Sequence, residues 1–121
     1  MMAVNTTELV IPIQANLKSL LQAIGTPETI VFQALRRYLL EICWQRLESA
    51  EQQVAMYEER YKLDYAIFYQ KVTQDELFLT ELEGRYPMWE ADALEWHYRL
   101  EERELWQQRL GSSANIYSVP K

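Results

Sequence analysis

Hydrophobic residues recur every three or four positions along most of the chain, which predicts a mainly α-helical protein with one long central helix. Residues 15–24 have the i, i+3, i+4, i+7 spacing of an amphipathic helix, carried by Leu17, Leu20, Leu21 and Ile24. We expect Gly25 to end this helix in a left-handed conformation. Thr26-Pro27-Glu28 is typical of a helix start, because Thr caps an N-terminus, Pro suits the first helical position, and Glu suits the first turn.

The helix that opens at Thr26 meets no helix breaker until about Lys62. Seven residues within it alternate in steps of three and four, as in the seam of a coiled coil: Leu40, Cys43, Leu47, Ala50, Val54, Tyr57 and Tyr61. Such a seam is buried against another helix. The sequence leaves open whether that helix comes from the same chain or from a second copy.

Residues 7–13 are the only stretch with the β-branched content of a strand. Leu9, Ile11 and Ile13 alternate onto one face, and Pro12 restricts the strand to an edge or a short two-stranded pairing. A lone strand cannot satisfy its own backbone groups, and the sequence predicts no second one. We therefore expect one short N-terminal β-strand that pairs with the same strand of a second copy, followed by helices.

Shorter helices are predicted after the long one. Asp64 and Asp75 can each cap a helix, and after a break at residues 84–87 a further helix runs to about Leu110. We divide the chain into residues 1–47, residues 48–110 and a flexible tail over residues 111–121.

Charge differs between these segments. The whole chain of 121 residues has a net charge of −6, but residues 1–47 carry four basic and three acidic side chains, whereas residues 48–121 carry eight basic and fifteen acidic ones. This balance disfavours nucleic-acid binding over the whole surface. The acidic part suits either a solvated helical surface or a basic partner. With no membrane span or secretory signal predicted, we expect a soluble, cytoplasmic protein.

Few residues carry the chemistry of an enzyme or a metal site. The three glycines are far apart, so the chain has no phosphate-binding loop. On a helix, Glu95 and His97 point about 200° apart, so they cannot hold one ion together. Cys43 lies on the predicted seam, which favours a buried, inert thiol. We therefore predict a protein that is not an enzyme and binds no metal and no cofactor.

Aromatic residues are numerous, with four Trp, eight Tyr and three Phe. Such rings fill a core or anchor a partner. The candidates for partner binding are Trp89, Trp96, Tyr98 and Trp106. Trp89 and Trp96 share a helical stripe with Ala93 and Leu100, which favours the core for these two, so Tyr98 and Trp106 are the stronger interface candidates.

The N-terminal part resembles the ribbon-helix-helix family in the order of its segments: residues 9–13, residues 17–24, Gly25, residues 26–28, and Ala34-Leu35-Arg36-Arg37-Tyr38-Leu39. This resemblance implies that residues 1–47 form a dimerisation head. The implied dimerisation residues are Leu9, Ile11, Ile13, Leu35 and Leu39.

In that family, DNA is read by polar side chains on the outward face of the strand. Here that face has Glu8, Val10 and Pro12, which offer no side-chain donors, so we favour dimerisation over base readout. Weak contacts to DNA phosphate are expected only from Thr26, at a helix N-terminus, and from Lys18.

Residues 48–106 resemble the acidic C-terminal region of small antitoxin-like proteins of cyanobacteria and archaea, through Tyr57-Glu58-Glu59-Arg60-Tyr61, Leu63-Asp64-Tyr65, Pro87-Met88-Trp89-Glu90 and Asp92-Ala93-Leu94-Glu95-Trp96. In related chains the position of Lys62 tends to be Gly. The resemblance implies an antitoxin of a toxin–antitoxin pair, a homodimer or higher oligomer whose acidic helical part covers a small basic toxin. Autoregulation through weak DNA binding would fit such a protein. The alternative is a homo-oligomeric helical scaffold or assembly factor that binds no DNA.

Overall fold

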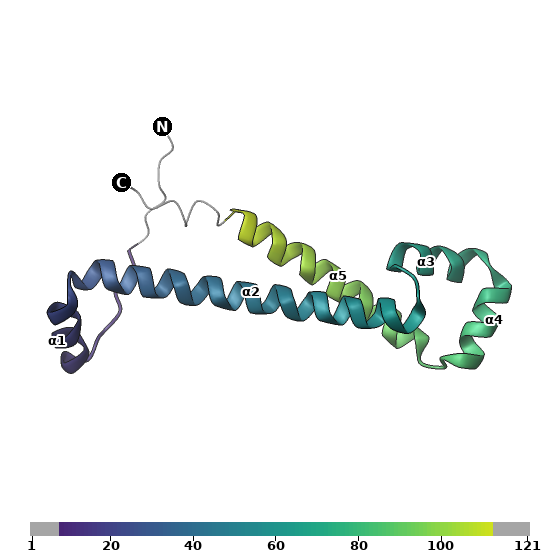
Figure 1. Cartoon of the computed structure of the whole chain (residues 1–121), viewed down its shortest axis with the longest axis horizontal. Coiled ribbons are helices and arrows are strands. Elements are labelled where there is room, and N and C mark those ends of the chain that lie inside the picture. Colours follow the sequence, from purple (N-terminus) through teal and green to yellow (C-terminus); the bar gives the residue numbers. More distant parts are fainter. Residues whose placement is uncertain (1–7, 113–121) are drawn as a thin grey trace, which may run out of the picture. The chain divides into compact units, whose positions relative to one another are not determined.

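The computed structural model describes residues 8–112, and its secondary structure within that range consists of five helices (Figure 1). These are α1 (Ala15–Ile24), α2 (Pro27–Tyr61), α3 (Tyr65–Gln74), α4 (Glu76–Arg85) and α5 (Trp89–Ser112). The prediction of a mainly α-helical chain with one long central helix is confirmed. The chain forms two compact units that divide between Arg37 and Tyr38, so α2 contributes to both.

The predicted N-terminal β-strand is wrong. Residues 8–14 form neither strand nor helix, and residues 8–112 contain no strand to which they could pair. Leu9, Ile11 and Ile13 are exposed. A β-branched, alternating sequence becomes a strand only when a neighbour supplies hydrogen bonds, and Pro12 has no N–H to donate. The predicted intermolecular ribbon therefore has no strand from which to form, and Thr7 lies outside the described residues.

The N-terminal unit, residues up to Arg37, contains α1 and the start of α2. The predicted bounds of α1 are confirmed, but the predicted conformation of Gly25 is wrong. Gly25 has a φ of 171°, which is extended backbone, and its N–H donates to the carbonyl of Leu21 at 3.0 Å. The helix therefore ends with a backbone hydrogen bond and no left-handed residue. None of the side chains of α1 is buried.

Two aspartates start the short helices, as predicted. The Asp64 carboxylate accepts a hydrogen bond from the Ile67 N–H at 2.8 Å, and the Asp75 carboxylate accepts one from the Phe78 N–H at 3.1 Å. Each bond satisfies an N–H group that the first helical turn leaves without a partner. These two caps fix where α3 and α4 begin.

Lys62 provides the turn between α2 and α3. It has a φ of 58°, the one non-glycine residue of the described range with a positive φ. This left-handed conformation is the one that glycine adopts without steric cost after a helix C-terminus. The backbone at position 62 therefore favours Gly.

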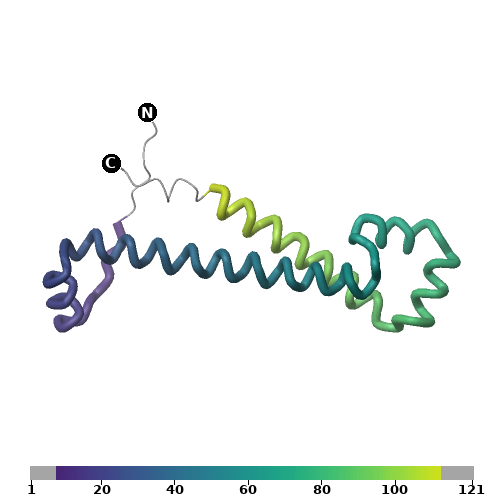
Figure 2. Tube along the Cα trace, in the orientation of Figure 1, coloured from purple at the N-terminus to yellow at the C-terminus, as the bar shows by residue number. Residues whose placement is uncertain are grey.

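The C-terminal unit, residues from Tyr38 onward, is built on an antiparallel pair of helices. α5 returns along the second half of α2, and α3 and α4 connect the adjacent ends of the two (Figures 1 and 2). Side-chain contacts show the antiparallel direction. Trp96, early in α5, contacts Tyr61 at the end of α2, whereas Trp106, later in α5, contacts Arg46, which comes earlier in α2. The predicted seam of α2 thus packs against a helix of the same chain.

The core of this unit confirms most of the predicted seam and stripes. The buried residues grouped into one cluster are Val54, Tyr57, Tyr61, Phe68, Leu82 and Trp96. Leu40, Leu47 and Ala50 of the seam are also buried, whereas Cys43 is half-buried. The division between the compact units lies ten residues before the predicted one after Leu47.

The predicted tail over residues 111–121 falls mostly outside the described residues. Gly111 and Ser112 still belong to α5, and residues 113–121 lie outside the described residues. Between residues 8 and 112, no helix combines the length and the apolar composition that crossing a bilayer requires.

Candidate functional site

The centre of the C-terminal unit is an aromatic cluster formed by Tyr57, Tyr61, Tyr65, Phe68 and Trp96. The indole of Trp96 is fully buried, with its ring stacked at 5.8 Å on both Tyr57 and Tyr61 of α2. From α3, Tyr65 meets it edge-on at 5.2 Å and Phe68 lies at 5.3 Å. Rings at these separations add to the burial of apolar area, so Trp96 joins three helices.

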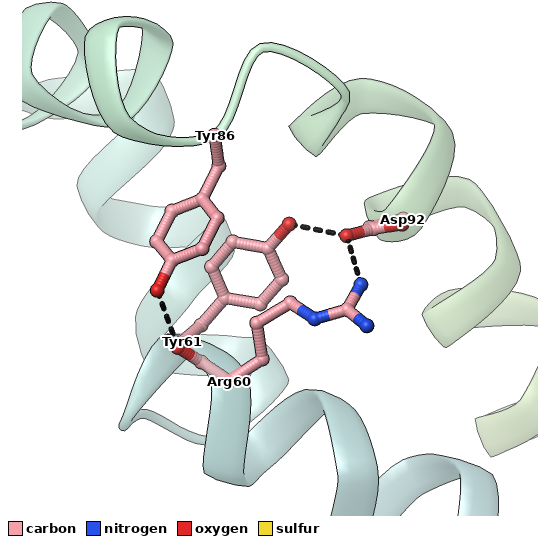
Figure 3. Close-up of polar contacts among 4 residues, drawn as sticks. All are labelled: Arg60, Tyr61, Tyr86 and Asp92. Atoms are coloured by element: carbon pink, nitrogen blue, oxygen red, sulfur yellow. Dashed lines mark hydrogen bonds and ion pairs between the residues drawn. The ribbon is translucent and has the colours of Figure 1, made fainter.

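A polar link lies beside this cluster (Figure 3). One carboxylate oxygen of Asp92 accepts from the guanidinium of Arg60 at 2.6 Å and from the hydroxyl of Tyr61 at 2.5 Å. The hydroxyl of Tyr86, in the segment between α4 and α5, donates to the carbonyl of Arg60 at 3.3 Å. The end of α2 is therefore tied to the start of α5 and to the segment that precedes it.

The surroundings of the tyrosines change their acidity. Burial, followed by the hydrogen bond to Asp92, raises the pKa of Tyr61 above its ordinary value of 10.0. Burial also raises the pKa of Tyr57, with a further contribution from the charge of Glu95, and burial raises the pKa of Tyr65. The pKa of Arg60 is raised chiefly by its hydrogen bond to Asp92. All these shifts keep the phenols neutral and the guanidinium charged, which suits a structural role.

The four aromatic candidates for partner binding lie in different environments. Trp96 is fully buried, so the prediction of Trp96 as a partner contact is wrong and its assignment to the core is right. Trp89 is half-buried against the same core. Trp106 is half-buried, with the guanidinium of Arg46 at 5.3 Å and that of Arg109 at 4.7 Å from its ring.

Of those four, Tyr98 is the exposed one, with 57% of its surface accessible. It lies on the side of α5 opposite Trp96, since two residues rotate about 200° around a helix. A partner can therefore reach Tyr98 without disturbing the core.

The N-terminal unit exposes a large share of its apolar side chains. On α1, Leu17, Leu20 and Ile24 are all exposed, and so are Phe32 and Leu35 on α2. Leu39, four residues after Leu35 on the same helix, is exposed as well. Exposed apolar side chains on both helices of the N-terminal unit are typical of an interaction surface. Dimerisation through Leu35 and Leu39 stays a prediction.

The two residues predicted to contact DNA phosphate are both accessible. Lys18 is exposed on the first turn of α1, and Thr26 is exposed immediately before the first residue of α2. Thr26 therefore lies at a helix N-terminus, as expected from the sequence. Binding of DNA by these residues stays a prediction.

The side chains with catalytic or metal-binding chemistry lie apart. Among residues 8–112, no group of three or more His, Cys, Asp or Glu side chains is placed to hold a metal ion. Nε2 of His97 lies 2.5 Å from a carboxylate oxygen of Glu101, one turn along α5, and Tyr65 lies against the imidazole. These contacts belong to a helix surface.

The C-terminal unit has a strongly acidic surface. Residues 38–112 carry 16 acidic and eight basic side chains. Exposed carboxylates occur on α2 at Glu48, Glu51 and Glu58, on α4 at Glu81 and Glu83, and on α5 at Glu90, Glu95, Glu101 and Glu104. The arrangement is thus a fixed aromatic core under a negative surface, which favours basic partners.

Two features of this unit were missed in the sequence. The link between Arg60 and Asp92 joins residues 32 positions apart, and no local pattern announces such a pair. Leu94, Tyr98 and Leu105 form a second apolar row on α5, which helical spacing alone could have revealed beside the core stripe.

Comparison of the chain with family models, with curated proteins and with solved structures finds no match.

Proposed function

We propose that this chain is a non-enzymatic protein-binding module, in which the N-terminal unit associates with a second copy and the acidic C-terminal unit binds a basic protein. In its specific form the proposal is an antitoxin that neutralises a small basic toxin. The observation that carries it is the charge of residues 38–112, with twice as many acidic as basic side chains on a packed helical unit.

Self-association is supported by the apolar surface of the N-terminal unit. Helix α1 has no buried side chain, although Leu17, Leu20 and Ile24 share one face of it. Covering apolar area contributes roughly 25 cal/mol for each Å² removed from water. This association uses helix faces and no β-ribbon.

Binding of a basic protein is supported by the way the acidic unit is held together. The aromatic cluster and the link between Arg60 and Asp92 fix α2 and α5, so the helix positions that carry the exposed carboxylates are set before a partner arrives. Complementary charge speeds association, and a preorganised surface loses less conformational entropy on binding.

The test is co-expression with the product of the adjacent reading frame. We expect that frame to encode a small basic protein that stops growth when expressed alone, and we expect growth to return when this chain is co-expressed. The two proteins should then purify as one complex. Growth arrest without rescue, together with separate elution of the two proteins, rejects the proposal.

The alternative is a homo-oligomeric scaffold, and it is favoured by one observation, the exposed apolar side chains of the N-terminal unit. A scaffold assembles without a basic partner. Sedimentation of the purified chain separates the two ideas, because a scaffold forms the same large assembly whether or not the adjacent gene product is present.

A further inference from the structure

Helix α5 has two apolar faces, and only one of them belongs to the core. Trp89, Ala93, Trp96 and Leu100 face the aromatic cluster. On the opposite side, Leu94, Tyr98 and Leu105 follow one another at i, i+4 and i+11, within about 40° of one another around the helix axis. We call these three residues the outer row. Their accessible fractions are 74%, 57% and 41%, so within the described chain no element covers them.

The core does not need the outer row. Single exposed leucines are ordinary on protein surfaces, but here three large apolar side chains share one side of α5 over three turns. A helix with a second apolar strip has the geometry on which another amphipathic helix can pack.

Carboxylates flank the outer row on both sides. By helical position, Glu90 and Glu101 lie along one edge, whereas Glu95 and Glu102 lie along the other. Glu95 and Glu102 both lie near Arg99, at 3.6 Å and 3.1 Å, and Glu101 lies beside His97. Glu95 and Glu102 thus share the charge of Arg99, so the four flanking carboxylates keep a net negative charge beside the strip.

We infer that the outer row of α5 is the docking site for a basic amphipathic helix of the partner protein. The apolar side of such a helix covers Leu94, Tyr98 and Leu105, while its Lys or Arg side chains reach the flanking carboxylates. A second copy of α5 fits less well, because its own carboxylates would meet those of the first. The inference rests on the proposed function, which supplies the basic partner.

The first test uses a synthetic helical peptide of about 18 residues, with Leu along one face and Lys elsewhere, and a second peptide with the same composition in scrambled order. Binding to the full chain is measured by calorimetry at two salt concentrations. We expect the amphipathic peptide to bind at least tenfold more tightly than the scrambled one, and more weakly at high salt. Equal binding of the two peptides overturns the inference.

The second test compares two triple variants of the full chain. Leu94→Ala, Tyr98→Ala and Leu105→Ala together remove the outer row. Ile67→Ala, Leu77→Ala and Met88→Ala remove side chains with accessible fractions of 43%, 70% and 69% elsewhere on the same unit. We expect the outer-row variant to lose at least tenfold in peptide affinity, and the control to stay within twofold. Both should melt near the temperature of the unchanged chain, because none of the six side chains is buried.

Equal losses in the two variants overturn the docking site. If the outer-row variant instead changes the sedimentation of the chain in the absence of peptide, the outer row contacts a second copy and the inference is wrong.

Co-expression with the adjacent gene product distinguishes failure of the docking site from failure of the proposed function. A complex that the outer-row variant forms unchanged rejects the docking site and leaves the proposed function standing. If the peptide binds to the outer row but the chain forms no complex with the adjacent gene product, the proposed function is rejected.

Discussion

The guanidinium of Arg60 and the hydroxyl of Tyr61, neighbours at the end of α2, share a single carboxylate oxygen of Asp92 on α5. The side chain of Asp92 is 20% accessible and that of Arg60 is 38% accessible. Water therefore screens part of the attraction, and the contact is worth less than a buried ion pair. The position of the contact matters more than its strength, because it joins the end of α2 to the start of α5. Asp92 lies 32 residues after Arg60 and 31 residues after Tyr61 in the sequence.

Asp92→Asn should lower the free energy of unfolding by about 1–2 kcal/mol, because it removes the charged acceptor of two hydrogen bonds. Urea unfolding at pH 7 measures the change. Glu90→Gln is the control, since Glu90 is also an acidic residue in the first turn of α5. It reports the loss of charge at the helix N-terminus alone, about 0.5 kcal/mol. Equal losses for the two variants would show that the link adds nothing to the helix effect.

Alkaline pH should destabilise the C-terminal unit through its tyrosines. The pKa values of Tyr57, Tyr61 and Tyr65 are all raised in the folded chain, chiefly by burial. The folded chain thus holds these protons to a higher pH than the unfolded chain does. Stability is therefore fully present below the ordinary tyrosine pKa of 10.0 and is lost as the pH rises above it.

Tyr61→Phe isolates the contribution of one of these groups. Between pH 10 and 11 the unchanged chain should lose stability more steeply than the variant, by up to about 1.4 kcal/mol per pH unit. Urea unfolding at pH 8, 10 and 11 provides the slopes. Tyr38→Phe, which removes an exposed tyrosine, is the matched control. Parallel slopes for Tyr61→Phe and the unchanged chain would contradict the prediction.

Lys62→Gly should stabilise the protein by about 0.5–1 kcal/mol. The left-handed backbone at Lys62 costs a residue with a side chain about 1–2 kcal/mol, and the greater freedom of Gly in the unfolded chain offsets part of the gain. Lys62→Ala keeps this backbone cost and is the matched control. A thermal melt in which the two variants behave alike would indicate that the conformation is not strained.

Trp106→Ala should cost about 1–2 kcal/mol of unfolding free energy even without a partner. The ring is half-buried and lies beneath the guanidinium groups of Arg46 and Arg109, so its loss removes both cation–π contacts and apolar packing. Tyr98→Ala is the control, because Tyr98 is an exposed aromatic side chain on the same helix. An unchanged melt for Trp106→Ala would instead identify the ring as a free interface anchor.

The parts of this fold that follow from nearby residues could be predicted from the sequence. Asp64 and Asp75 mark helix starts because a cap depends on residues three positions away, and the seam from Leu40 to Tyr61 follows from helical period. The strand prediction failed because strand formation depends on a distant partner, which alternation at Leu9, Ile11 and Ile13 does not supply.

The same distinction applies to the candidate site. The acidic surface follows from composition, whereas the contact of Arg60 with Asp92 depends on how α3 and α4 turn the chain back. The periodicity of α5 contained both of its apolar rows. The core stripe around Trp96 could be recognised from helical spacing, and the same spacing relates the residues of the outer row on the opposite face.

Leu35→Asp combined with Leu39→Asp should separate self-association from folding. Both side chains are exposed on α2, so a carboxylate at either position meets water in the single chain and should change the melt of the C-terminal unit little. In an oligomer that buries these positions, the same carboxylates are desolvated without a partner, at a cost of several kcal/mol. Analytical ultracentrifugation should therefore show a smaller species, and circular dichroism should show that its helices are retained.

Leu47→Asp is the contrasting variant, because Leu47 is buried within the chain and its replacement should unfold the unit itself. An oligomer that survives Leu35→Asp and Leu39→Asp would show that these two residues lie outside the contact between copies.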